Sequence, residues 1–184
     1  TDVAFTALWN YDMGAFYTKW MQDWRDAQGR ESNIGPRVGG GVLPHTAPTN
    51  DGGGGPAWGG ITVMLPWFMY RYYGDERILE ENYDMISRWL EFLESHVQDG
   101  ILRRFGGPWD FLADWLWPGA TAEGMNNDKP EAECFNSCYY ALNLSTAAAI
   151  ADVLGLKKDC RKWTAMAERT RRAVHRTFYD KEDS

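Results

Sequence analysis

The sequence predicts an all-α fold built from helical hairpins. Apolar residues recur at alternating intervals of three and four in five long segments, and no segment alternates with the period of a strand over any length. Single glycines, Gly74 and Gly155, separate two pairs of these segments, whereas about 30 residues separate the others, at 29–57 and 99–130. This spacing is typical of hairpins joined by long loops.

The first two helices are expected over residues 5–24 and 58–73. In the first, the face is formed by Phe5, Leu8, Trp9, Met13, Phe16, Tyr17, Trp20, Met21 and Trp24. In the second, Pro66 removes a backbone donor, so it should kink the helix or mark a new start. Gly74 then ends the second helix.

The third helix follows at once, with Asp75 as its expected N-cap. Its apolar face is formed by Leu79, Tyr83, Ile86, Leu90, Leu93 and Val97, and Asp99-Gly100 ends it. The last two helices are expected over 131–154, with Phe135, Cys138, Leu142, Ile150 and Val153 on one face, and over 158–178.

Composition and charge exclude several classes of protein. With 184 residues, 44% hydrophobic content and a net charge of −7, the chain is typical of one soluble globular domain. The acidic balance argues against a nucleic-acid partner, because neutralising phosphates requires a dense Lys and Arg surface. No window approaches the roughly 18 apolar residues needed to cross a bilayer. A neutral or cationic small molecule is the favoured partner.

The three cysteines favour a packing role over ligation or a disulfide. Cys134, Cys138 and Cys160 are odd in number, and their spacings match no zinc or redox motif. Cys134 and Cys138 lie one helical turn apart in an apolar stripe, so we expect them in the core. The sequence indicates neither a metal nor a cofactor.

The two long loops are the expected functional regions, because loops of this length are uncommon in a compact domain unless they have a role. Four tryptophans lie in or beside them, next to Gly, Pro or Asp: Trp58, Trp109, Trp115 and Trp117. Indole planes next to carboxylates are suited to a sugar, whose C–H face packs on the ring while its hydroxyls donate to the oxygens. These tryptophans could equally fill the ends of a helical barrel.

Catalytic carboxylates cannot be chosen from spacing alone. Glycoside hydrolysis needs two facing carboxyl groups, and the loop candidates are Asp51, Asp110, Asp114, Glu123 and Asp128. Each of them could instead cap a helix or a turn. His45 lies near Asp51, but no Ser or Cys stands in a nucleophile context, so a structural histidine is favoured.

Four motifs in order resemble the catalytic domain of bacterial α-L-rhamnosidases of glycoside hydrolase family seventy-eight. Residues 10–28 contain NYD, AFYTKW and DAQ; residues 44–59 contain PHTAPTND and GGGPAWG; residues 66–75 contain PW and YRYYGD; residues 114–116 are DWL. The ordered series is far more specific than any one motif. It covers most of the chain.

The resemblance implies that residues 1–184 form one fragment of an (α/α)6 six-hairpin barrel, so the fold here would be a partial barrel. It also implies inverting hydrolysis of terminal α-L-rhamnosyl residues, without a metal in the chemistry. It places Trp58 and Trp115 in the rhamnose pocket, with Asp51 and Asp114 as hydroxyl acceptors. The family's Glu general acid and Glu general base would lie outside this chain, so the fragment alone would be inactive. One departure is Ala113, where the family usually has Gly before the Asp.

Two alternatives to a rhamnosidase stay open. One is another six-hairpin glycosidase, and the other is a non-catalytic helical module that binds carbohydrate or protein. The start Thr1-Asp2-Val3 has no initiator Met and no signal-like core, which is typical of a piece of a longer polypeptide. The remainder of that polypeptide would be a partner, and the cellular location stays undetermined.

Overall fold

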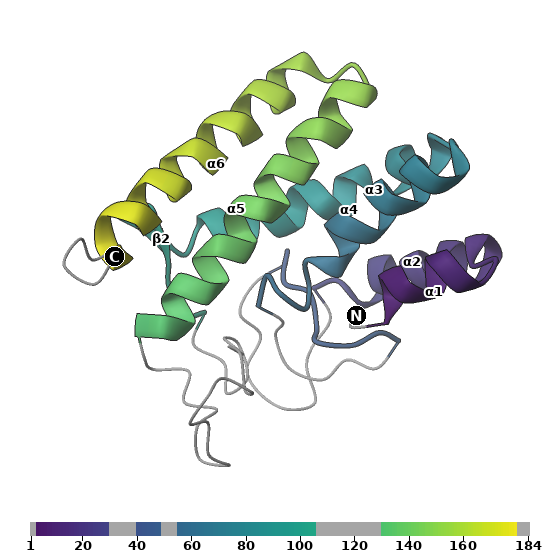
Figure 1. Cartoon of the computed structure of the whole chain (residues 1–184), viewed down its shortest axis with the longest axis horizontal. Helices are drawn as coiled ribbons and strands as arrows, with labels where there is room; N and C mark the ends of the chain where they lie inside the picture. Colours follow the sequence, from purple (N-terminus) through teal and green to yellow (C-terminus); the bar gives the residue numbers. More distant parts are fainter. Residues whose placement is uncertain (1–2, 30–39, 49–54, 106–129, 180–184) are drawn as a thin grey trace, which may run out of the picture.

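The computed structural model describes residues 3–29, 40–48, 55–105 and 130–179, and these residues are mostly helical. Figure 1 shows the elements in order: α1 (Ala4–Asn10), α2 (Gly14–Ala27), α3 (Ile61–Tyr73), α4 (Arg77–Glu94), β1 (Val97–Gln98), β2 (Ile101–Leu102), α5 (Pro130–Val153) and α6 (Lys157–Phe178). The predicted all-α class is confirmed. Within the described ranges, none of these helices has the length and apolar character to cross a membrane.

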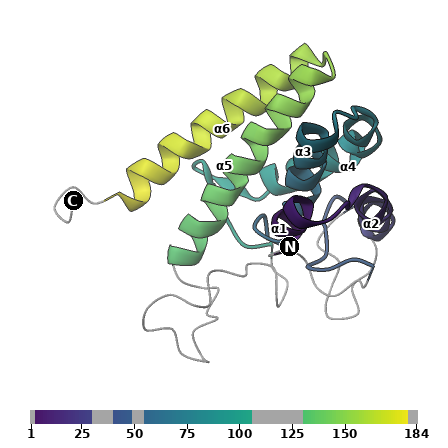
Figure 2. The same cartoon turned by 45° about the vertical axis from the view of Figure 1, so that its right-hand side comes forward.

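Two helical hairpins, α3–α4 and α5–α6, pack against each other with their axes inclined (Figures 1 and 2). The Thr146 hydroxyl of α5 contacts the Met64 sulfur of α3 at 3.3 Å. Between α4 and α6, the Tyr83 hydroxyl donates to Asp159 at 3.0 Å near the start of both helices. Arg169 further along α6 donates to Glu94 at the end of α4. α4 therefore runs parallel to α6.

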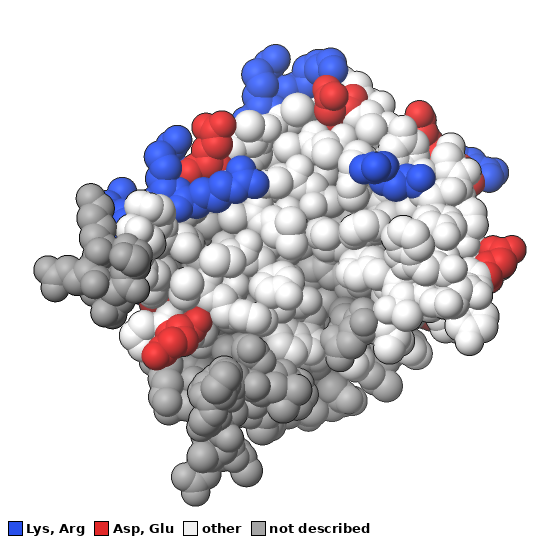
Figure 3. Space-filling model, viewed as in Figure 1, with Lys and Arg blue, Asp and Glu red and all other residues white. Residues whose placement is uncertain are grey.

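The paired helices differ in charge. α5 carries no charged residue between Glu133 and Asp152, and most of its residues are buried or half-buried. Lys and Arg gather over α6, while charged groups are sparse over the middle of the same face (Figure 3). α5 is thus an interior helix and α6 an exterior one, as expected for hairpins in a helical barrel.

The core is rich in large aromatic side chains. Three tryptophans of the helices, Trp24, Trp89 and Trp163, are almost completely buried, and Trp20 and Trp67 are half-buried. Each buried indole removes a large apolar area from water, which is the main stabilising contribution in such a core.

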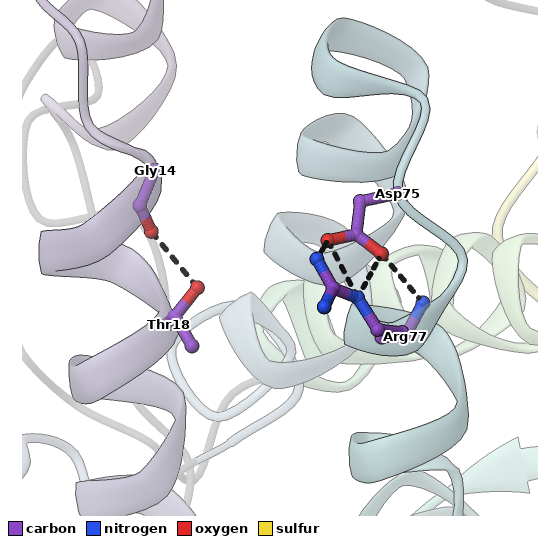
Figure 4. A network of polar contacts seen from close by, with 4 residues as sticks. All are labelled: Gly14, Thr18, Asp75 and Arg77. Carbon is purple, nitrogen blue, oxygen red and sulfur yellow. Dashed lines mark hydrogen bonds and ion pairs between the residues drawn. The ribbon is translucent and has the colours of Figure 1, made fainter.

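The short turns match the prediction. Gly74 and Gly155 both adopt φ +72°, in the left-handed region where a residue without Cβ is favoured. Asp75 accepts a 3.0 Å hydrogen bond from the Arg77 amide at the start of α4, and its carboxylate also binds the Arg77 guanidinium (Figure 4). The prediction that Asp75 is the N-cap is wrong by one position: the N-cap is Glu76, whose side chain makes no capping hydrogen bond, and Asp75 binds the first helical amide from the residue before it.

The single helix expected over 5–24 is wrong, because the chain leaves the helix at Tyr11–Met13. The carboxylate of Asp12 accepts from the Gly14 amide at 3.2 Å, which caps α2. The Met13 amide donates to the Tyr73 hydroxyl at 3.0 Å. The apolar spacing continues across the break, so the pattern alone could not reveal it.

The other boundaries also moved. α3 begins at Ile61 rather than 58 and continues through Pro66, so this proline does not start a new helix. α4 ends at Glu94, and the predicted extension to Val97 instead forms the β1–β2 hairpin. Asp99 and Gly100 adopt φ +53° and +83°, the conformation of a tight two-residue hairpin turn.

The core assignment of the cysteine pair is wrong for Cys138, which is exposed, whereas Cys134 and Cys160 are half-buried. Leu142, expected on the same buried face, is 44% exposed. The face of α5 that packs inward instead carries Ser137, Tyr140 and Leu144. In a helix that is apolar on most sides, periodicity does not identify the buried face.

Candidate functional site

The turn before α3 is where the structure places the one described member of the predicted sugar pocket, Trp58. The Trp58 and Gly59 amides both donate to the Gly55 carbonyl, at 3.0 and 2.9 Å. The Ile61 amide then donates to the Trp58 carbonyl at 3.1 Å. Residues 55–60 therefore form a compact hydrogen-bonded turn that leads directly into the helix.

The Trp58 side chain lies at the edge of the core, between the start of α3 and the start of α5. Its residue is half-buried, and its ring lies 6.3 Å from the Phe135 ring, with 49° between the planes. Phe135 in turn lies 4.9 Å from the ring of Tyr139 one helical turn later. A half-buried indole held by a second aromatic ring can offer its remaining surface to a ligand.

A hollow of about 290 Å³ opens beside this turn. Its walls come from three helices and the turn itself, including Phe5, Ala57, Met64 and Tyr139. The hollow is mainly apolar. It therefore suits the C–H face of a sugar, while the hydroxyl groups need polar partners from other segments.

The turn is attached to α5 by a buried amide. Asn143 Nδ2 donates to the Pro56 carbonyl at 3.0 Å and to the Tyr139 carbonyl at 2.6 Å, and Asn143 is completely buried. Gly60 leaves room for this contact, since a Cβ at Gly60 would lie 2.0 Å from the Pro56 oxygen and 2.5 Å from Asn143 Oδ1. The glycine is required by close packing.

The other predicted pocket residues, Asp51, Asp114 and Trp115, lie outside the described residues, as do Trp109 and Trp117. The loop carboxylates Asp110, Glu123 and Asp128 also lie outside them. The pocket roles of Asp51, Asp114 and Trp115 therefore stay predictions.

Sequence reasoning missed Asn143 and Phe135 as neighbours of the predicted pocket. Asn143 was visible as a polar residue in the long uncharged part of α5, and a buried amide in such a place must find hydrogen-bond partners. The helical spacing of Phe135 predicts a core face. It does not indicate that Phe135 meets Trp58, which lies 77 residues earlier in the chain.

Titratable groups with large shifts lie elsewhere, between the helices of the two hairpins. Burial raises the pKa of Tyr83 to about 12; its hydroxyl also accepts from Trp163 at 3.1 Å and donates to Asp159. Burial and the neighbouring Glu94 carboxylate raise the pKa of Tyr140. Both tyrosines stay neutral at ordinary pH and join helices, so their roles are structural.

A larger groove of about 580 Å³ lies between α5 and α6, but its chemistry does not suit glycoside hydrolysis. Its described lining includes Cys134, Cys138, Arg171 and His175, and no carboxylate among the described residues faces it. A glycosidase needs two carboxyl groups at the sugar. Among the residues that the structure describes, no group of three or more His, Cys, Asp and Glu could hold a metal ion.

Comparison with known proteins gives one consistent family. Residues 2–184 match the model of the bacterial alpha-L-rhamnosidase six-hairpin glycosidase domain. An alpha-L-rhamnosidase from Streptomyces avermitilis is 32% identical over 176 residues, which are 94% of this chain and 15% of that protein. An alpha-L-rhamnosidase from Formosa agariphila is 29% identical over 95% of this chain and 17% of its own length. The chain thus spans about a sixth of these relatives.

Solved structures agree with this result. The Streptomyces avermitilis alpha-L-rhamnosidase complexed with L-rhamnose superposes with a TM-score of 0.76 and 28% identity, over 97% of this chain and 15% of that one. The alpha-L-rhamnosidase from Dictyoglumus thermophilum gives a TM-score of 0.73 and 28% identity, over 95% of this chain and 18% of that one. The family match over nearly the whole sequence and the same arrangement of hairpins together show that this chain belongs to the bacterial α-L-rhamnosidase six-hairpin glycosidase domain family.

Proposed function

We propose that this chain is one part of the (α/α)6 catalytic domain of a longer α-L-rhamnosidase, which hydrolyses terminal non-reducing α-L-rhamnosyl residues with inversion. The observation that carries the proposal is the family match over residues 2–184. It is supported by an apolar hollow at the start of α3, whose lining includes Pro56, Ala57 and Gly60 of the turn that carries the half-buried Trp58. The substrate class is a rhamnose-containing oligosaccharide or glycoside.

In this proposal, Trp58 and Trp115 pack against the sugar, and Asp51 and Asp114 accept hydrogen bonds from its hydroxyls. Rhamnose carries a methyl group at C6, which gives an indole an apolar partner. Hydrogen bonds to a carboxylate are charge-assisted and directional, so the two aspartates fix the orientation of the ring. The apolar contacts then supply affinity and the polar ones supply specificity.

Cleavage itself requires a general acid and a general base, with their carboxyl groups about 6.5–9.5 Å apart across the sugar and a water between them. Two carboxylates that lie between the paired helices have structural partners: Glu94 binds Arg169 and Tyr140, and Asp159 binds Tyr83. The proposal therefore assigns acid and base to other parts of the polypeptide. The part described here supplies binding surface.

The decisive experiment measures the full-length enzyme against aryl α-L-rhamnosides, aryl glucosides and unsaturated uronides, with the anomeric product followed by NMR. We expect turnover of the rhamnoside alone, with inverted stereochemistry. Preference for another sugar would indicate a different six-hairpin glycosidase. Binding without turnover of any substrate would indicate a non-catalytic module.

Two variants refine the assignment. Asp114→Asn in the full-length enzyme should lower kcat/KM by an amount on the order of 1.5–3 kcal/mol, because a charge-assisted hydrogen bond to the sugar is weakened. The 184-residue chain alone should show no turnover. Turnover by this chain that is abolished by changing Asp51 or Asp114 would place the catalytic pair inside it and contradict the proposal.

A further inference from the structure

We propose that Asn143 is a positioning residue for Trp58: its buried amide holds the 55–60 turn against α5 and so sets the orientation of the indole in the sugar pocket. The link to sugar binding rests on the proposed function. The link to Trp58 geometry rests on the contacts of α5 alone.

Burial restricts the conformation of the Asn143 side chain. Its side chain is completely buried in the part of α5 that carries no charged residue. A buried amide is costly unless its polar atoms are bonded, and here Nδ2 donates both hydrogen bonds while the buried Oδ1 accepts none from any described residue. The two donated bonds therefore hold the side chain in one rotamer. One of them stays within the helix, to the Tyr139 carbonyl; the other crosses to the Pro56 carbonyl, 87 residues away in sequence.

The hydrogen bond from Asn143 to Pro56 lies close to Trp58 in the sequence. Pro56 lies two residues before Trp58, and Gly60 lies two residues after it. Asn143 holds the first through a hydrogen bond and packs against the second, where no Cβ could fit. The Trp58 ring itself meets Phe135, also on α5. α5 therefore contacts the turn on both sides of Trp58, at Pro56 and Gly60, and also contacts the Trp58 ring.

Asn136 provides a comparison within the same helix. Asn136 is also completely buried on α5, two helical turns earlier, and its amide donates to the Ala132 carbonyl at 2.8 Å. Asn136 therefore shares with Asn143 the burial and the intrahelical hydrogen bond, and among the described residues the bond to the turn before α3 comes from Asn143. This makes Asn136 a matched control.

The test uses the full-length enzyme with Asn143→Ala and Asn136→Ala. We expect Asn143→Ala to raise KM about five- to tenfold while kcat changes less, because loss of one buried hydrogen bond lets Trp58 leave its binding orientation. Asn136→Ala, which removes a buried amide but leaves the bond to Pro56 in place, should raise KM less than Asn143→Ala does. In a Trp58→Ala background, Asn143→Ala should have no further effect on KM.

A second readout does not depend on activity. In protein labelled with 5-fluorotryptophan, the ¹⁹F resonance of Trp58 is assigned by its loss in Trp58→Phe. It should shift in Asn143→Ala and stay in place in Asn136→Ala, while the Trp163 resonance stays in place in both. If Asn143→Ala does not fold, Asn143→Leu keeps the side-chain volume and removes both hydrogen bonds.

Three results would overturn the inference. The first is a Trp58 resonance that does not shift in either Asn143 variant, and the second is a shift of that resonance in Asn136→Ala as large as in Asn143→Ala. The third is an increase in KM on Asn143→Ala that is just as large in the Trp58→Ala background. Failure of the proposed function looks different. The parent enzyme would then not hydrolyse rhamnosides, yet the fluorine spectra would still show whether Asn143 positions Trp58.

Discussion

The two ends of the stacked hairpins are built in different ways. At the end with short turns, the turns themselves are held by local, exposed contacts: Asp75 binds Arg77, and Lys157 binds Asp152. Long-range contacts also occur near this end, since Tyr73 accepts from the Met13 amide and Tyr83 donates to Asp159. At the opposite end, near the start of α3 and α5, contacts join distant segments, as between Asn143 and Pro56 or Trp58 and Phe135. The two short turns therefore depend on neighbouring residues, whereas the turn before α3 is held by residues of another hairpin.

This difference indicates why the predicted pocket lies at the second end. A binding surface needs side chains from several segments held by a rigid scaffold, and long-range contacts provide both. Local turns provide neither. Substitutions at the pocket end should therefore change stability, substrate affinity or both, whereas substitutions at the end with short turns should change stability alone and by a smaller amount.

The largest effect is expected from Gly60→Ala. The new Cβ would lie 2.0 Å from the Pro56 oxygen, so backbone and Asn143 must both move. We expect the free energy of unfolding to fall by about 3 kcal/mol, the cost of overpacking a tight site. Urea denaturation measures this loss. A stability within about 0.5 kcal/mol of the parent would show that the turn is adaptable and would remove the contrast between the ends.

Trp58→Ala should affect binding more than folding. The side chain is half-buried, so its removal should weaken substrate binding by about 1–3 kcal/mol in the full-length enzyme, with little change in Tm. Isothermal titration with a rhamnoside and thermal denaturation separate the two effects. A large fall in Tm with unchanged affinity would assign Trp58 to the core instead.

Gly74→Ala tests the end with short turns. A Cβ there meets nothing within 4 Å, so the only cost is the backbone strain at φ +72°. We expect a loss of about 1 kcal/mol in unfolding free energy and no change in substrate affinity. Gly74→Asn should recover part of the loss, because asparagine tolerates the left-handed region. An affinity change in either variant would mean that the two ends are coupled.

The smallest effect is expected from Asp75, whose exposed carboxylate has a lowered pKa because Arg77 hydrogen bonds to it. A carboxyl group with a lower pKa in the folded state stabilises the fold above its unfolded pKa near 4, and this contribution is lost as the pH falls through the folded pKa. Asp75→Asn should therefore reduce stability slightly at pH 7 and not at pH 2. Equal losses at both pH values would assign the effect to the helix cap alone.

The sequence predicted the local features and missed the long-range ones. The turns at Gly74 and Gly155 and the helices α4 to α6 follow from patterns within a few residues, and they are confirmed; the N-cap of α4 is Glu76 rather than the predicted Asp75. The break between α1 and α2 depends on Tyr73, 60 residues from Met13, so spacing could not reveal it. For the same reason the sequence pointed to Trp58 without indicating Phe135 or Asn143.

The hydrogen bond between Asn143 and Pro56 also bears on the order of folding. It closes a loop of 87 residues, so the entropy of chain closure delays it until both hairpins have formed from their local contacts. We expect local opening to break this long-range contact before the local contacts within each hairpin. Amide hydrogens in the 55–60 turn should accordingly exchange with solvent sooner than those in the middle of α4 or α5. The pocket end would be the last part of the fold to form and the first to open.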